Sequence, residues 1–422
     1  MKRFQSIALS LLLAVLVTGL LLYKVVFIAT MAVTPSFWTV YGLIATVFLV
    51  SRIPYAYLHN DAHETVYPDA AYPSVSIIIA AKNEEKGIFR TITTCVASDY
   101  PGKIECIVID DGSSDGTKDE VIRAQNRYGS RVRLIVFPEN RGKREAMAIG
   151  INEALHEIII FVDSDSFLAR DALRHITEHF LAHARIGAVS GNTKVENVNA
   201  NMLTRMQSIQ YAVSFDIYKA SESVHHSVTC CPGCFSAYRK STIQPLAAAW
   251  KEHKFMGSKS TFGDDRGLTN FVLQSGWDIV YCQKAKATTV VPEKFSVYWR
   301  QQLRWKKSWI REGLFAGTFM WKKRHPLASF AFYTNFSFPI VGPILAGNVF
   351  VNSLATHNPL LFVVFMSGFM LLGTVFALFT RVCFSTENWM YMPFVSLLFV
   401  CVFIWQMPYA LLTLRKTHWG TR

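Results

Sequence analysis

Long apolar runs at both ends of the chain constrain its fold more than any other feature. The first run spans residues 6–33, and a second follows it directly over residues 37–53. An apolar helix of about 20 residues can cross a bilayer, whereas the apolar part of a signal peptide is shorter. Residues 1–55 are therefore predicted to form two transmembrane helices rather than a cleaved signal peptide, and a lipid bilayer is an expected partner.

Three further apolar segments predict a C-terminal membrane region over residues 327–414. They cover residues 327–355, 360–380 and 390–414. The basic N-terminus places residue 1 in the cytoplasm, and two crossings return the chain there near Arg52. Three more full crossings would leave the basic tail, residues 415–422, outside. One segment is therefore predicted to be re-entrant, split or interfacial. The first and last segments, which contain prolines, are the candidates.

The net charge of +13 agrees with a multi-pass protein of the plasma membrane that carries basic residues on its cytoplasmic side. It also favours anionic substrates such as nucleotide diphosphates. No nucleic-acid-binding motif accompanies the charge, so nucleic acid is not an expected partner.

The middle of the chain, residues 74–292, is predicted to be a cytoplasmic α/β domain. Short apolar runs at 75–81, 105–109, 132–137 and 157–162 read as strands. Helical stretches at 84–97, 117–128 and 144–154 alternate with them. This alternation indicates a Rossmann-like, mostly parallel sheet with helices on both faces. Ligands of such sheets bind at the carboxyl ends of the strands.

Residues 293–326 are predicted to form amphipathic helices at the membrane interface. Trp299, Leu303, Ile310 and Leu314 share one helical face, and basic residues follow throughout. An amphipathic helix of the cytoplasmic domain is the alternative.

The eight cysteines include one Cys-x-x-Cys pair, Cys231 and Cys234, but no second pair that would complete a zinc site. Neither zinc nor disulfides are expected.

Three acidic clusters are the candidate functional residues of the α/β domain. Asp110-Asp111 and Asp163-Ser164-Asp165 each follow a predicted strand, and Asp264-Asp265 follows Gly263. Each cluster alone is typical of a turn or helix cap. Two clusters that end strands of one parallel sheet meet at the same edge, which favours a shared site.

Such a site suits the transfer of a sugar from a nucleotide diphosphate. A divalent cation would stabilise the charge on the leaving group, and Mg²⁺ commonly uses one or two carboxylates plus substrate phosphates. Lys143, Arg144 and Arg304 are the candidate cationic groups for the diphosphate. Asp265 is the candidate base for the acceptor hydroxyl, and Trp305 offers an aromatic face to a sugar ring.

These motifs together resemble the processive family-2 glycosyltransferases, which include hyaluronan, chitin and cellulose synthases. The ordered set consists of Asn83-Glu84, Asp110-Asp111-Gly112-Ser113, Asp163-Ser164-Asp165, Gly263-Asp264-Asp265-Arg266 and Gln301-x-x-Arg304-Trp305. The resemblance covers nearly the whole chain. It implies a cytosolic GT-A domain fused to α-helical transmembrane segments that form an exit channel. It also implies UDP-sugar donors, a growing polysaccharide acceptor and Mg²⁺ or Mn²⁺.

The resemblance also implies roles for individual residues. Asp111 would contact the uridine and Asp163 the nucleotide, Asp165 would hold the metal, and Asp265 would be the catalytic base. Arg304 would bind the diphosphate and Trp305 the acceptor end of the polymer. The reaction would be an inverting displacement, which needs no second nucleophilic carboxylate. The further residues expected at the substrates are Asn83, Glu84, Lys143, Arg144, Asp264, Arg266, Gln301, Cys231, Trp419 and Arg422.

Within this family the sequence points to two polymers. The stretches 255–270 and 301–312 and the ending Trp419-Gly420-Thr421-Arg422 are similar to hyaluronan synthases, which makes hyaluronan the preferred product. The cysteine-rich stretch 230–239 departs from them and resembles rhizobial chitin-oligosaccharide synthases, so chitin is the alternative. A mixed polymer such as a glucosyl-glucuronan is third.

Two alternatives belong to other functional classes: a transferase that adds a single sugar to a lipid carrier, and a catalytically silent binding protein. Asn335 and Asn348 are expected to face a hydrated sugar path or to bond between helices.

Overall fold

The computed structural model describes residues 37–59, 67–259 and 262–415, together with residues 15, 18–20, 22, 23 and 25. Most of the first predicted transmembrane run therefore lies outside the described residues, as do Trp419 and Arg422 of the tail.

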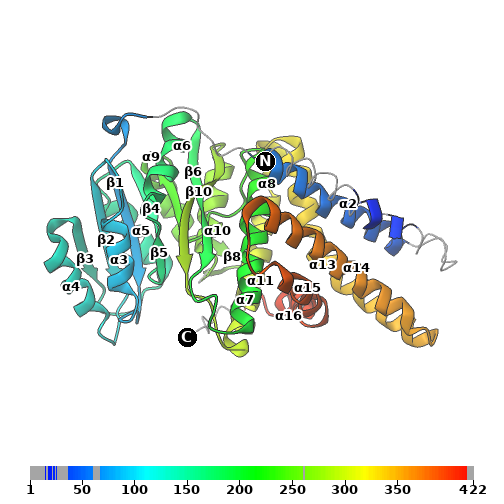
Figure 1. Ribbon diagram of the computed structural model, residues 1–422. Coiled ribbons are helices and arrows are strands. Elements are labelled where there is room, and N and C mark those ends of the chain that lie inside the picture. Colours follow the sequence, from blue (N-terminus) through cyan, green and yellow to red (C-terminus); the bar gives the residue numbers. More distant parts are fainter. Residues whose placement is uncertain are drawn as a thin grey trace.

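An eight-stranded mixed sheet forms the centre of the α/β domain (Figure 1). Its order is β3 (Val132–Val136), β2 (Ile104–Asp110), β1 (Val75–Ala81), β4 (Ile158–Phe161), β7 (Ser236–Arg239), β6 (Ile186–Val195), β10 (Asp278–Thr289) and β5 (Ser166–Leu168). The first four strands are parallel, as predicted, and their bounds match the apolar runs of the sequence within one residue. The predicted fold class is confirmed.

The other half of the sheet departs from the parallel pattern. Strand β7 runs antiparallel to both β4 and β6, and Ser236 at its start pairs with Phe161 at the end of β4. The loop that precedes β7 therefore lies at the same edge of the sheet as Asp163. An antiparallel strand thus carries residues 230–235 to the carboxyl ends of the parallel strands.

Helices cover both faces of the sheet, which explains why the strands read as continuous apolar runs. The flanking helices are α3 (Ile88–Val96), α4 (Thr117–Tyr128), α5 (Lys143–Glu153), α6 (Ala172–Ala182), α9 (Lys240–Lys251) and α10 (Asp264–Gln274). Ile77 and Ile79 of β1 point into the core on one face, with α3, α4 and α6. Ile78 points into the other core, which includes α5, α9 and α10 and continues to residues of the membrane helices.

Helix α11 (Phe295–Gly317) lies between the sheet domain and the helices of the membrane region (Figure 1). The described chain has four candidate membrane spans: Tyr41–Leu58, Pro326–Ala355, Pro359–Phe384 and Trp389–Leu412. The first three correspond to α2 (Phe37–Leu58), α13 (Pro326–Ala355) and α14 (Pro359–Phe384). These extend away from the sheet, with the short helix α12 (Met320–Lys323) before α13.

The two proline-containing segments behave differently. Helix α13 is continuous through Pro339 and Pro343. The last segment is broken at Val402 (φ −125°, ψ −60°) and folds back beside α11. Its pieces are η4 (Trp389–Tyr391), α15 (Met392–Cys401), η5 (Phe403–Trp405) and α16 (Gln406–Leu412). Of the two candidates, the last segment is therefore the split one.

Close packing of α5 on the sheet yields a first prediction. A Cβ atom on Gly150 would lie 2.5 Å from Ile78 Cγ2 and 3.2 Å from Ile109 Cδ1. Alanine favours helices, but overpacking costs about 1–3 kcal/mol, so Gly150→Ala should lower the free energy of unfolding. Chemical denaturation in detergent would measure it. The exposed control Asn152→Ala on the same helix should be neutral or stabilising. Equal stability of the two variants would contradict the packing argument.

Candidate active site

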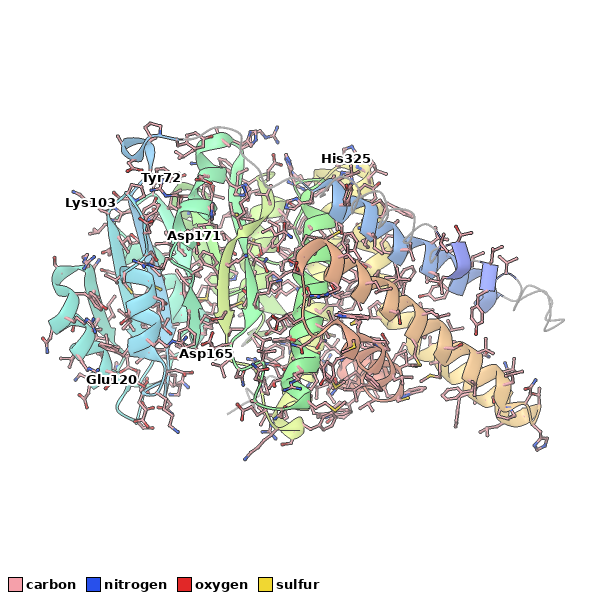
Figure 2. All side chains as sticks on the ribbon, viewed as in Figure 1. Tyr72, Lys103, Glu120, Asp165, Asp171 and His325 are labelled. Carbon is pink, nitrogen blue, oxygen red and sulfur yellow. The ribbon has the colours of Figure 1, made fainter. Side chains whose placement is uncertain are left out.

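The predicted site residues meet where α5 begins, at the carboxyl edge of the parallel strands. Lys143, the first residue of α5, forms an ion pair with Asp163 after β4. Arg144, the next residue, donates from Nε to Asp264 Oδ1 at 2.7 Å, and both side chains are buried. Asp165 lies at the lower edge of the sheet in Figure 2, opposite Tyr72 and Lys103, which lie near the starts of β1 and β2. Two sequence-distant acidic clusters are thereby held by consecutive residues.

Two interlocked loops shape the edge next to β1 and β2. Asp111 accepts hydrogen bonds from the backbone N–H groups of Arg141 (2.6 Å) and Gly142 (2.9 Å). The amide oxygen of Asn83 accepts the N–H of Ser114 at 2.9 Å, and the N–H of Glu84 donates to Thr117 Oγ1 at 2.7 Å. The residues expected at the nucleotide thus order one another. Burial raises the pKa of Asp111, whereas the hydrogen bonds from the two backbone N–H groups lower it.

Asp163 and Asp165 offer the oxygen ligands that a hard divalent cation prefers. Burial, and then the charge of Asp163, raise the pKa of Asp165 to about 6, so a cation bound there would favour its ionised form. Within the described residues, no three His, Cys, Asp or Glu side chains converge on one point. A Mg²⁺ or Mn²⁺ ion held by Asp163 and Asp165 would need further oxygen ligands, such as those of a diphosphate.

Asp265 lies in the first turn of α10, behind Gly263, whose φ of +85° favours glycine. Its Oδ1 accepts the N–H of Arg266 at 2.8 Å, and the Cys230 thiol donates to its Oδ2 at 3.7 Å. Burial lowers the pKa of Arg304 on α11, whereas Asp265, Asp163 and Asp264 raise it. Arg304 is therefore within electrostatic reach of the acidic residues that Lys143 and Arg144 contact.

The loop before β7 joins the two sides of this site. A Cβ atom on Gly233 would lie 2.9 Å from both Asp163 Oδ1 and Lys143 Nζ, so a side chain would intrude on that pair. Cys230, three residues earlier, reaches Asp265. Cys231, the residue singled out from the sequence, is fully buried, and its N–H donates to Thr269 Oγ1 at 2.9 Å. The Cys230 thiol therefore borders the site, whereas that of Cys231 is buried.

A cavity of about 770 Å³ begins beside Cys230 and Arg266 and continues among α2, α13 and α14. Asn335, Asn348 and Asn352 of α13 line it. Trp309 of α11 also lines it, whereas Trp305, the aromatic residue predicted from the sequence, is 41% exposed.

Sequence reasoning missed Lys219, Glu222 and Trp309 at the cavity. Lys219 ends a π-helical turn, η3 (Ser214–Lys219), between α7 (Met202–Val213) and α8 (Ala220–Ser223), and it donates to the carbonyl of Cys230. No residue spacing in the sequence signals that turn. Trp309 was visible as an aromatic residue one turn after Trp305.

Comparisons with known proteins show the family to which the chain is similar. The family described as glycosyltransferase-like family 2 matches residues 73–308. An N-acetylglucosaminyltransferase of Mesorhizobium japonicum is 32% identical over 284 residues, which cover 65% of this chain and 66% of that protein. One of Sinorhizobium fredii is 32% identical over 286 residues, covering 66% and 68%. The chain thus matches about two thirds of the length of these relatives.

A solved structure shares the fold. The mannosyltransferase PcManGT from Pyrobaculum calidifontis, in complex with GDP-Man and Mn²⁺, superposes with a TM-score of 0.56 at 18% identity. The superposition covers 85% of this chain and 98% of that one. At this identity the likeness concerns the arrangement of sheet and helices.

The raised pKa of Asp165 yields a second prediction. A carboxylate must be ionised to bind a cation, so Mn²⁺ affinity should fall as the pH falls through about 6, by roughly tenfold at pH 5. Electron paramagnetic resonance of Mn²⁺ in the presence of UDP would measure it. Asp165→Asn should bind weakly at every pH, while the exposed control Asp119→Asn should behave as wild type. Unchanged binding by Asp165→Asn would remove Asp165 as a ligand.

Proposed function

Because the chain belongs to glycosyltransferase-like family 2, we propose that it transfers N-acetylglucosamine from UDP-N-acetylglucosamine to a growing chitin-type oligosaccharide. One observation carries the proposal: Cys230 and Arg266 line a cavity between membrane helices, and the Cys230 thiol donates to Asp265 of the acidic group. The relatives named N-acetylglucosaminyltransferase support this sugar. They favour a chitin-type oligosaccharide as the product, whereas the hyaluronan-like stretches of the sequence favour hyaluronan.

The geometry suits a direct displacement. Asp163 and Asp165 would hold a Mg²⁺ or Mn²⁺ ion, which neutralises charge on the departing diphosphate. Lys143 and Arg304 bring positive charge to the same group. Asp265 accepts the proton of the acceptor hydroxyl as that oxygen attacks the anomeric carbon and UDP leaves with inversion. The Cys230 thiol links Asp265 to the lining of the cavity, where the acceptor would lie.

The cavity supplies a path for the product. Its asparagines can hydrogen-bond to sugar hydroxyls, and aromatic side chains such as Trp309 and Tyr41 offer flat apolar faces. The path runs from Arg266 at the base to Asn352 and Thr356 near the far end of α13. In this arrangement the α/β domain is cytoplasmic, and the oligosaccharide leaves through a multi-pass plasma-membrane region.

A donor assay tests the sugar. Purified protein in vesicles with Mn²⁺ and UDP-N-acetylglucosamine alone should release UDP and form oligosaccharide. Asp265→Asn should lower turnover by about 100-fold or more while it keeps donor binding, and Asp119→Asn should match wild type. Turnover that requires UDP-glucuronic acid as well would establish the hyaluronan alternative. A product of one sugar on a lipid would establish transfer to a lipid carrier.

Site-specific cross-linking tests the path. A photoreactive amino acid in place of Asn348, which lines the cavity, should cross-link to radiolabelled product during synthesis. Val351, less than one turn away and 60% exposed, is the matched control and should cross-link to lipid instead. Equal labelling of the glycan from both positions would argue against a product path along this cavity.

A further inference from the structure

A buried carboxylate lies behind the turn that carries the proposed base. Glu312 of α11 is 2% exposed. The side-chain amide of Asn270 in α10 donates to its backbone oxygen at 2.9 Å and to its Oε2 at 3.3 Å. A Cβ atom on Gly267 would lie 3.5 Å from that Oε2, and one on Gly263 would lie 3.7 Å from its Cγ. The carboxyl group thus packs directly against the backbone of the first turn of α10.

Charged groups surround Glu312 on three helices. Arg144 of α5 and Arg266 of α10 favour its ionised form, Asp264 of α10 disfavours it, and Arg311 adjoins it on α11. Arg144 is already paired with Asp264, yet its Nη2 has no hydrogen-bond partner among the described residues. Burial has the largest effect and raises the pKa of Glu312 to about 7. Both charge states are therefore populated near neutral pH.

We propose that Glu312 is a positioning residue: its carboxyl group packs beneath the first turn of α10, and the charge that it gains on ionisation acts through that turn on Asp265. A negative charge near a carboxylate raises its affinity for a proton, and it draws Arg144 and Arg266 toward α11. Glu312 is buried beneath the turn, so it acts through the turn rather than on the substrate. The inference rests on the proposed function for its effect on turnover.

The matched variant is Glu312→Gln, which keeps the shape and an acceptor for Asn270 but cannot ionise. At pH 6 wild-type Glu312 is mostly protonated, so the two proteins should turn over at similar rates. At pH 8 wild type should be faster by roughly tenfold. Because both proteins carry the same other titratable groups, the ratio of their turnover rates reports the ionisation of Glu312. Glu312→Asp should keep the pH dependence, and the control Glu120→Gln, a half-buried glutamate on α4, should match wild type throughout. A rate ratio that does not change with pH would overturn the proposal.

Thermal unfolding gives a readout that does not need the reaction. Because the pKa of Glu312 is raised in the folded protein, its protonated form stabilises the fold. This stabilisation is fully present below pH 4.5, the ordinary pKa of the group, and is lost as the pH rises through about 7. The Tm of Glu312→Gln relative to wild type should therefore rise between pH 5.5 and pH 8.5. A constant Tm difference would refute the titration of Glu312. If wild type turns over no UDP-N-acetylglucosamine while the Tm difference still varies, the assigned donor fails and the titration stands.

Discussion

The paired cations at the start of α5 are the interaction on which the site depends. Lys143 binds Asp163 of the loop after β4, and Arg144 binds Asp264 at the start of α10. The Arg144–Asp264 pair is buried, and the loss of one partner of such a pair typically costs about 3–5 kcal/mol because the other charge stays unpaired. The acidic residues after β4 and those at the start of α10 are therefore held at a fixed spacing by one helix terminus.

The sheet and the membrane helices are joined around the same point. Antiparallel β7 brings residues 230–235 across the end of β4, and Cys230 and Arg266 then form the beginning of the cavity. The core that contains Ile78 extends without interruption to Phe332 of α13 and Phe376 of α14. In the proposed function, transfer at the sheet edge and passage of the product between membrane helices would thus share one continuous packed core.

Fold class and much of the site could be predicted from local patterns. The four parallel strands matched their apolar runs because strands buried on both faces need continuous apolar sequence. The acidic residues after β2 and β4 had to meet because parallel strands share one carboxyl edge. Local patterns did not indicate that Cys230 and Trp309 line the cavity, and the substrate roles of Cys231 and Trp305 stay predictions. Which side of a loop or helix faces a cavity depends on packing partners far away in the chain.

By itself, the sequence determined the membrane segments, the α/β core and the chemical type of the site, because each follows from residue composition and spacing within short windows. Only the tertiary structure decided that Arg144 pairs with Asp264, that the last apolar segment breaks at Val402, and that Glu312 lies under the turn carrying Asp265. Residues 144 and 264, like 265 and 312, are far apart in the sequence. Their contacts exist only because α5, α10 and α11 pack together.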